Sequence, residues 1–345
     1  MKTTSAFNQL TILILLVLGL ACSSQSKKDA ADFFLKGNQA LKQKNYAEAL
    51  RFYDEAIAKN ADFSDAYLNK GICLLKLDQA EDAYEILSQA IKIDPSLAQA
   101  NLVRAEAALS LSKLNEAKVD LDLIQKRYTD STYFHLLQGN LYVAKGSPDQ
   151  AVAAFDQALT LDKGNIEAYV NRGAVYYSLS SFPAAKIDFL NALQLDPNQP
   201  QALNNLGLIY LRERNWKEAL DHFDKVLNLD PSDAFALNNK GYALLQTGSS
   251  EKAKELIERS LEKRPENGYA LRNLGIYYQQ KGQLELAINM FIKAIDIAEP
   301  VEMLYGLAGQ AYFQQKKLAE ACKIWKQGII LKDSVSMASA AKYCH

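Results

Sequence analysis

Residues Pro200–Asp233 read PQALNNLGLIYLRERNWKEALDHFDKVLNLDPSD, and this stretch predicts two helices joined by a turn. Apolar residues recur at helical spacing in its first half and again in its second half. Asn215 lies between the two patterns and predicts a tight turn, because Asn tolerates the left-handed conformation that ends a helix. The second helix is expected to stop at Asp230, since the residue before Pro231 is pushed out of helical geometry. Two helices of this kind cannot bury their apolar faces alone, so they need neighbours.

The chain supplies those neighbours as copies of the same pattern every 34 residues. Alanine occupies one position in all copies: Ala49, Ala83, Ala117, Ala151, Ala185, Ala219, Ala253, Ala287 and Ala321. A second position holds glycine except in the third copy: Gly37, Gly71, Ala105, Gly139, Gly173, Gly207, Gly241, Gly275 and Gly309. A third position holds a large apolar residue: Tyr53, Leu87, Leu121, Phe155, Phe189, Phe223, Ile257, Phe291 and Trp325. Glycine inside a helix costs about 1 kcal/mol relative to alanine, so the glycines predict a close approach of paired helices.

These residues resemble the tetratricopeptide repeat, a helix-turn-helix unit with a period of 34. The resemblance runs from Ala30 to Val335 without an insertion or deletion and is weakest in the third copy, which has Ile124 for alanine and Thr129 for proline. It implies an all-α, right-handed α-solenoid with a concave groove. The nine gapless repeats are 30–63, 64–97, 98–131, 132–165, 166–199, 200–233, 234–267, 268–301 and 302–335. Residues 336–345 are expected to form a partial C-terminal capping helix, covering the last repeat through Met337, Ala338 and Ala341.

The N-terminus resembles a bacterial lipoprotein signal peptide. Residues 1–21 carry one lysine and a short apolar run and end in Gly19-Leu20-Ala21 before Cys22, although an aliphatic residue is usual where Gly19 stands. The resemblance implies that Cys22 is acylated, for instance with palmitate, and becomes the mature N-terminus. The alternative is an ordinary secretory signal cleaved near Ala21. Polar residues 22–29 favour a tether to the membrane, by resemblance the periplasmic face of a bacterial outer membrane.

Composition and motifs argue against catalysis and nucleic-acid binding. The 345 residues have a formal net charge of −1 with mixed signs, whereas nucleic acid usually draws a basic patch. His135, His222 and His345 are isolated, without the spacing of zinc ligands. No phosphate-binding glycine motif occurs, and little sequence lies outside the repeats. We therefore expect no enzyme activity, cofactor, metal or small-molecule substrate.

A row of asparagines predicts where a partner binds. In this family the first helix of each repeat lines the concave face, and one position there carries Asn69, Asn171, Asn205, Asn239 and Asn273. Asn204 and Asn238 directly precede two of them. The row resembles the asparagine ladder in the repeats of O-GlcNAc transferases, which implies contacts with the backbone of an extended peptide. The alternative is that each amide only hydrogen-bonds a neighbouring group.

Two further patterns leave alternatives open. Lys70, Arg172 and Lys240 each precede a repeat glycine and could form a basic stripe, but packed stems with solvated charges are the favoured interpretation. Cys322 and Cys344 could form a disulfide that clamps the C-terminus, or remain free thiols.

The sequence thus predicts a membrane-anchored scaffold or assembly adaptor of the bacterial envelope that binds peptide segments of partner proteins. The alternatives are a substrate-delivery subunit for a separate enzyme such as a glycosyltransferase, and a self-associating structural scaffold.

Overall fold

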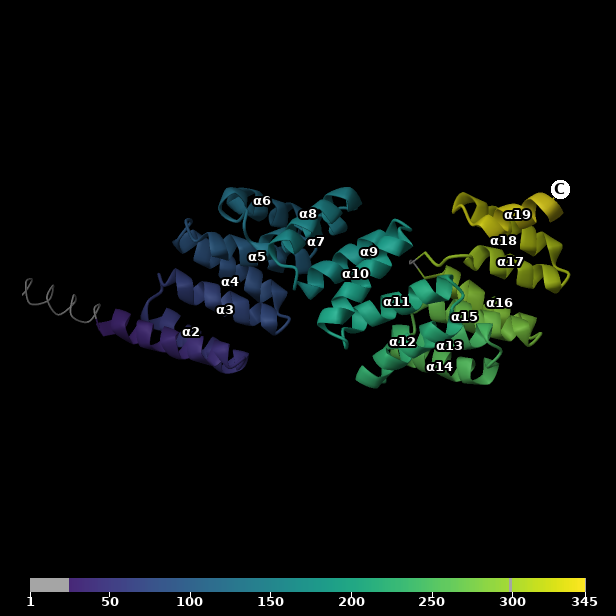
Figure 1. The fold of residues 1–345 in the computed structure, drawn as a ribbon, viewed down its shortest axis with the longest axis horizontal. Helices are drawn as coiled ribbons and strands as arrows, with labels where there is room; N and C mark the ends of the chain where they lie inside the picture. Colours follow the sequence, from purple (N-terminus) through teal and green to yellow (C-terminus); the bar gives the residue numbers. More distant parts are fainter. Residues whose placement is uncertain (1–24, 298–299, 345) are drawn as a thin grey trace, which may run out of the picture. The chain divides into compact units, whose positions relative to one another are not determined.

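A computed structural model describes residues 25–297 and 300–344, and these residues form helices joined by turns, with no strand among them (Figure 1). The prediction of an all-α repeat fold is confirmed. The chain divides into two compact units, residues 1–175 and 176–345, and the boundary falls inside helix α9. Each unit is a series of helical hairpins that follow one another in sequence order.

The first unit starts, in its described part, with helix at residues 25–42. It continues with α2 (Tyr46–Lys59), α3 (Ser64–Lys76), α4 (Ala80–Ile93), α5 (Ala98–Ser110), α6 (Leu114–Ile124), the 3-10 turn η1 (Gln125–Arg127), α7 (Thr132–Ala144), α8 (Pro148–Leu161) and α9 (Ile166–Ser178). The second unit contains α10 (Phe182–Leu195), α11 (Pro200–Arg212), α12 (Trp216–Leu229), α13 (Ala234–Gln246), α14 (Ser250–Lys263), α15 (Gly268–Gln280), α16 (Leu284–Ile295), α17 (Leu304–Gln314), α18 (Leu318–Ile330) and α19 (Ser334–Tyr343).

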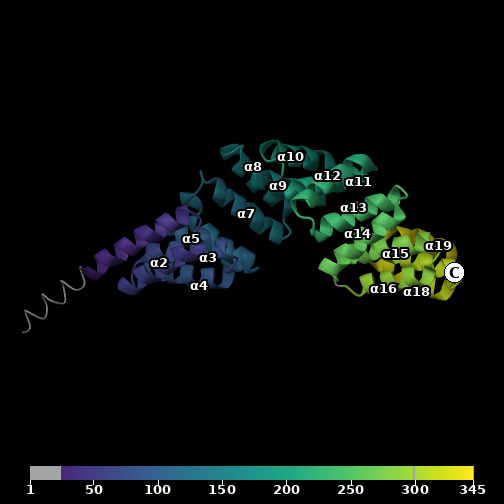
Figure 2. The same ribbon diagram turned by 90° about the horizontal axis from the view of Figure 1, so that it is seen from below.

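Each hairpin is held together by the contact that the repeated glycines predict. A Cβ atom built on Gly207 would lie 2.5 Å from Cε1 of Phe223, which is fully buried in the facing helix. A Cβ atom built on the equivalent glycines of both units would likewise lie 2.2 to 2.6 Å from the large residue of the same repeat. The glycines at these positions are Gly37, Gly71, Gly139, Gly241, Gly275 and Gly309. The nine repeated alanines are all fully buried. Within each unit, a second helix also packs on the first helix of the next repeat, as α12 does on α13 (Figure 2).

The turn between the helices of a repeat has the same conformation in all nine repeats, but its position corrects one expectation. The left-handed residue is Arg214, with φ +56°, whereas Asn215 has φ −88° and serves as the N-cap of α12. Its equivalents, all with positive φ, are Lys44, Asp78, Ser112, Gly146, Ser180, Gly248, Gly282 and Lys316. Asn215 misled because Asn favours both left-handed and N-cap positions.

At the N-terminal end the structure modifies the predicted tether. Residues 25–29 are helical, and the Ser26 hydroxyl donates to the Lys59 carbonyl at 2.6 Å, so most of the polar segment belongs to the first helix. The predicted signal peptide 1–21 and Cys22 lie outside the described residues. None of the described helices combines the length and the apolar character needed to cross a membrane.

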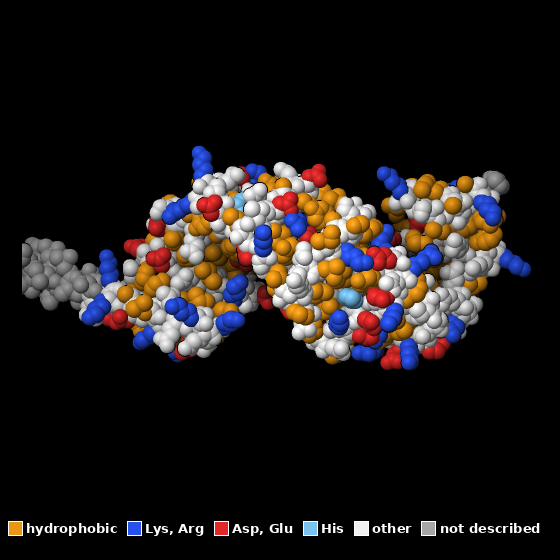
Figure 3. Space-filling model, in the orientation of Figure 1, with side chains coloured by type: hydrophobic (Ala, Val, Ile, Leu, Met, Phe, Trp, Pro, Cys, Tyr) orange, Lys and Arg blue, Asp and Glu red, His pale blue; other side chains and the backbone are white. Residues whose placement is uncertain are grey.

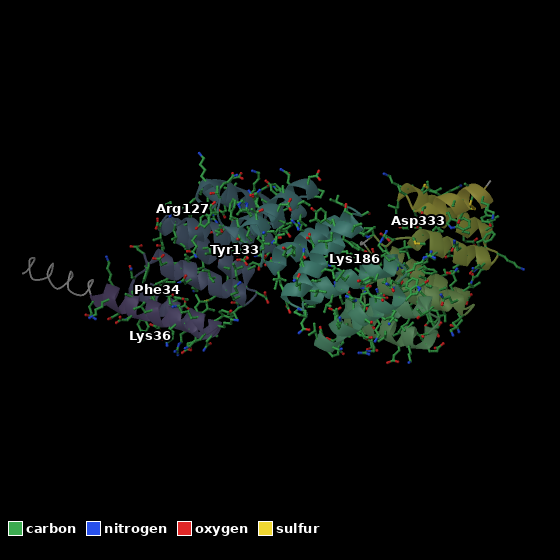
Figure 4. The ribbon with its side chains drawn as sticks, viewed as in Figure 1. Phe34, Lys36, Arg127, Tyr133, Lys186 and Asp333 are labelled. Carbon is green, nitrogen blue, oxygen red and sulfur yellow. A yellow bond between two sulfur atoms is a disulfide. The ribbon has the colours of Figure 1, made fainter. Side chains whose placement is uncertain are left out.

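At the C-terminal end α19 packs on the last hairpin, but through other residues than expected. Met337, Ala338 and Ala341 are exposed, while Ser336 and Ala340 are buried. The helix is turned this way because Ser336 fits against Gly328, where a Cβ would lie 2.1 Å from the Ser336 Oγ. Asp333, labelled in Figure 4, caps α19 by accepting from the Ser336 amide at 2.9 Å. A disulfide joins Cys322 and Cys344, whose Cα atoms are 5.7 Å apart.

Candidate functional site

The second unit contains a cavity of about 550 Å³ lined mainly by first helices of successive repeats, α11, α13 and α15. We call it the α11–α15 cavity. It is lined by Tyr177, Asn204, Leu208, Leu211, Arg212, Phe235, Asn238, Asn239, Tyr242, Arg264, Glu266, Asn267, Tyr269, Arg272, Asn273, Ile297, Glu302 and Met303. Helix α16 ends at Ile295 and α17 begins at Leu304, a wider separation than between α12 and α13 or between α14 and α15. Glu302 and Met303, which directly precede α17, line the cavity.

Large apolar side chains lie along one side of the cavity at the repeat spacing. Phe235, Tyr269 and Met303 are 34 residues apart, with exposed fractions of 50%, 39% and 50%. Their exposure means that they contribute little to the hydrophobic core. Ordered apolar side chains that are left in solvent beside a cavity are typical of a binding surface.

Polar side chains form a hydrogen-bonded chain through the same three helices. Arg272 Nη2 donates to Asn273 Oδ1 at 3.0 Å, and Asn273 Nδ2 donates to Asn238 Oδ1 at 2.8 Å. Asn238 Nδ2 then donates to Asn239 Oδ1 at 3.2 Å, and Asn239 Nδ2 to Asn204 Oδ1 at 3.1 Å. We call these five side chains the amide relay. All its bonds run in one sense, from α15 to α11, so they polarise one another and make the terminal Asn204 amide a stronger donor.

Arg272 is held between two aromatic rings. Its guanidinium carbon lies 5.5 Å from the Tyr242 ring centroid and 5.1 Å from that of Tyr269. Burial lowers the pKa of the Arg272 guanidinium, yet arginine remains protonated in proteins, so the group is a desolvated cation. Ring faces stabilise such a cation without neutralising it.

Charged side chains surround the mouth of the cavity. Arg212 lies 3.9 Å from a Glu302 carboxylate oxygen, and Arg264 lies 3.6 Å from one of Glu266. The Tyr177 hydroxyl is close enough to Arg212 to interact with it, although burial is the larger influence and raises the pKa of Tyr177. Charges of both signs and apolar side chains are interspersed on the face shown in Figure 3.

The first unit carries a different set of polar groups on its first helices. The Tyr133 hydroxyl donates to Glu106, and Glu167 lies close enough that the Glu106 charge acts on it (Figure 4 labels Tyr133). Desolvation first, and then the Glu106 charge, raise the pKa of Glu167; hydrogen bonds from Asn140 and Asn171 oppose the rise. This group, Glu106, Tyr133 and Glu167, is the acidic cluster.

The structure separates the predicted asparagines into two groups. Asn204, Asn238, Asn239 and Asn273 line the α11–α15 cavity, whereas Asn205 is half-buried on α11 and is not among the lining residues. In the first unit, Asn69 donates to Asn38 at 2.8 Å beside a cavity of about 460 Å³, and Asn171 donates to Asn140 at 2.9 Å. Each of these bonds joins neighbouring repeats, so the amides bind each other across helices.

Sequence reasoning missed the aromatic and arginine residues of the cavity. A usable signal was present, since Phe235, Tyr269 and Met303 recur at a first-helix position that the core does not need. Arg272 likewise occupies the repeat position of Asn204 and Asn238. The asparagine pattern by itself points to neither of these two sets of residues.

The three cations of the basic stripe are held in ion pairs between repeats, whereas solvated charges were expected. Lys70 contacts Asp54 at 2.6 Å, Arg172 contacts Asp156 at 2.5 Å, and Lys240 pairs with Asp224. Each pair joins the second helix of one repeat to the first helix of the next. Cys73 is buried, and burial raises the pKa of its thiol to about 11. The described residues contain no His, Cys, Asp and Glu group arranged to hold a metal ion.

Comparison with known proteins identifies the family of the repeats. Family profiles described as tetratricopeptide repeat match residues 40–103, 166–199, 200–233 and 232–299, and a profile described as TPR repeat matches residues 139–180. The chain carries tetratricopeptide repeats. Tetratricopeptide proteins mediate protein–protein interaction and assembly, and the similar proteins include a DnaJ homolog, a STIP1 homolog and a type IV pilus biogenesis factor.

Curated relatives are similar over part of their length. A DnaJ homolog subfamily C member 7 homolog of Schizosaccharomyces pombe is 29% identical over 176 residues, which are 45% of this chain and 37% of that protein. A STIP1 homolog of Dictyostelium discoideum is 28% identical over 131 residues, 38% of this chain and 23% of that protein. The matched part is therefore little more than a third of the first relative and less than a quarter of the second.

Two solved structures are similar in fold. The Cut9–Hcn1 tetramer of APC/C gives a TM-score of 0.65 at 18% identity, covering 81% of this chain and 55% of that chain. PilW, described as a type IV pilus biogenesis factor, gives a TM-score of 0.51 at 25% identity, covering 57% of this chain and 91% of PilW. The first likeness supports the fold alone.

Proposed function

We propose that this tetratricopeptide protein is a membrane-anchored adaptor of a bacterial envelope, and that the α11–α15 cavity binds an extended segment of a partner protein. The observation that carries the proposal is the coincidence, in one cavity, of exposed Phe235 and Tyr269 with the amide relay. Aromatic side chains supply apolar contact, and amides supply donors and acceptors for a peptide backbone. The packed repeat helices form the cavity by themselves, so binding requires little backbone rearrangement.

Anchoring is proposed from the sequence of residues 1–29, which resembles a lipoprotein signal peptide followed by a polar segment. Acylation of Cys22 would hold the protein at a membrane surface, close to the partner's assembly site. In growing cells, labelled palmitate should enter the full chain and should not enter a Cys22→Ser variant. Labelling that persists in the variant would exclude Cys22 as the acylated residue.

Site-specific photo-crosslinking in cells tests the binding site. A photoreactive amino acid in place of Tyr269 should yield a discrete adduct with a partner protein, and Phe235→Ala in the same chain should reduce its yield. The matched control places the photoreactive group at Leu286 on α16, which is 45% exposed but lies outside the cavity. Equal adducts from both positions, or no adduct from Tyr269, would contradict the proposed site.

A further inference from the structure

The charges that line the α11–α15 cavity do not balance. Among the described lining residues, three guanidinium groups face two carboxylates, which leaves one positive charge uncompensated. Arg212 and Arg264 lie 3.9 and 3.6 Å from carboxylate oxygens of Glu302 and Glu266, whereas Arg272 forms no such ion pair with a described residue, although the Glu302 charge acts on it. A desolvated cation without a directly paired carboxylate is unfavourable and attracts an anion.

The hydrogen-bond acceptors of Arg272 are neutral oxygens. Its Nε and Nη2 both donate to Asn273 Oδ1, at 3.2 and 3.0 Å, and its Nη1 donates to the Glu302 backbone carbonyl at 3.2 Å. A guanidinium has five N–H groups, so these three bonds leave one N–H on each terminal nitrogen. Tyr242 and Tyr269 hold the plane of the group in place. A fixed fork with free N–H groups matches the two oxygens of a carboxylate.

The neighbouring residues indicate an extended ligand rather than a free anion. The repeat position of Arg272 is taken by Asn238 and Asn204 in the two preceding repeats, and Phe235 and Tyr269 lie alongside. Packed helices are about 9 Å apart and an extended peptide advances about 3.3 Å per residue, so about three ligand residues span one repeat. A chain that reaches Arg272 on α15 therefore passes an apolar contact on α13 about three residues away.

We propose that the cavity recognises an extended peptide in which an internal aspartate or glutamate side chain binds Arg272 and an apolar side chain about three residues away contacts Phe235. This inference rests on the proposed function and adds the chemistry of the partner segment. We assign the carboxylate to a side chain and not to a chain end because the amide relay continues from Arg272 through α13 to Asn204. These amides can bind the peptide backbone on one side of the acidic residue. The Glu302–Met303 turn lines the other side.

The test uses the purified repeat chain with synthetic nonapeptide pools that are N-acetylated and C-amidated. Each pool has Phe fixed at position 4 and Glu, Gln or Lys fixed three residues to either side, with the other positions randomised. Competition against a fluorescein-labelled Glu pool should show Glu binding about tenfold more tightly than Gln, the size expected for a charged hydrogen-bonded pair. Lys should bind least.

Variants of the protein test whether Arg272 causes the preference for Glu over Gln. Arg272→Gln should abolish the preference for Glu over Gln, and Arg272→Lys should retain only part of it, because a lysine keeps the charge but not the fork. The matched control is Arg259→Gln, which also removes a guanidinium of the second unit, but one that lies outside the cavity and donates to the Pro231 carbonyl. It should leave the preference within about twofold, and unchanged circular dichroism would show that each variant is folded.

The outcomes separate the two claims. Equal binding of the Glu and Gln pools, with loss of both in Phe235→Ala, would overturn the acidic preference and leave peptide binding intact. A Glu preference that survives Arg272→Gln would overturn the role of Arg272. A Gln pool with a free C-terminus that binds as tightly as the blocked Glu pool would assign the carboxylate to a chain end and contradict the proposal. Binding of no pool would contradict both the acidic preference and the proposed cavity function.

Discussion

The two units share one repeat lattice but differ in the polar groups that they place on it. In both, a glycine on the first helix contacts a large residue on the second, as Gly139 contacts Phe155 in the first unit and Gly275 contacts Phe291 in the second. The first unit adds the acidic cluster, whereas the second adds the amide relay and Arg272. The difference teaches that binding chemistry can vary from repeat to repeat while the packing contact stays fixed.

The largest expected effect concerns the third repeat, where the first unit buries an ion pair. Asp120 is fully buried and accepts from Arg104 Nε and Nη2 at 2.8 and 2.7 Å and from Asn101 at 3.0 Å. Asp120→Ala should lower the free energy of unfolding by about 3 kcal/mol, because it leaves the partly buried Arg104 guanidinium and the buried Asn101 amide without their acceptor. Urea unfolding followed by circular dichroism measures the change.

The control in the second unit is Asp224, which pairs with Lys240 and is 50% exposed. Asp224→Ala should cost less than about 1 kcal/mol, because solvent screens exposed ion pairs. Equal losses for the two variants would mean that burial does not distinguish the two pairs.

The second prediction tests whether the glycine contact is equivalent in both units. Gly207→Ala should cost about 1–3 kcal/mol in unfolding free energy, since its Cβ would overlap the buried Phe223 ring. The third repeat already combines Ala105 with Leu121, both buried. Adding Phe223→Leu to Gly207→Ala should therefore recover most of that loss, as measured in a double-mutant cycle. Strictly additive losses would show that the two positions do not constrain each other.

The third prediction concerns the left-handed turn position. In the second unit, Arg214→Gly should stabilise the protein by about 0.5–1 kcal/mol, because glycine adopts positive φ without the penalty of a Cβ. In the first unit, Gly146→Ala should destabilise it by about 1 kcal/mol, although no atom lies within 4 Å of the new Cβ. Thermal melts measure both, and changes of the same sign would contradict the conformational argument.

The smallest expected effect is the pH dependence of the acidic cluster. The pKa of Glu167 is raised in the folded state, so folding favours its protonated form and the ionised form destabilises the fold as pH rises. Glu167→Gln should therefore raise the melting temperature slightly at pH 7, and the gain should disappear as pH falls towards 4. Glu55→Gln, at an exposed position on α2, is the control. A gain that grows in acid would contradict the sign of the shift.

The sequence was sufficient for the fold because each repeat contains its own packing contact. Gly207 and Phe223 are 16 residues apart, and the same pair recurs every 34 residues, so a local pattern predicts a tertiary contact. The asparagines of the relay could also be located, since they fall on two adjacent repeat positions, Asn204 and Asn238 on one and Asn239 and Asn273 on the next. The pairing of Asn239 with Asn204 could not, because it depends on how two first helices lie against each other.

The amino-acid sequence alone determined the period, the helical hairpins and the small residues that let them pack. Only the tertiary structure decided which side chains contact one another in the cavity formed by the packed helices. The Glu302 backbone carbonyl accepts a hydrogen bond from Arg272, whose guanidinium lies over the rings of Tyr242 and Tyr269. A repeat period fixes core contacts because every copy repeats them, whereas the chemistry of a cavity depends on residues that the copies do not share.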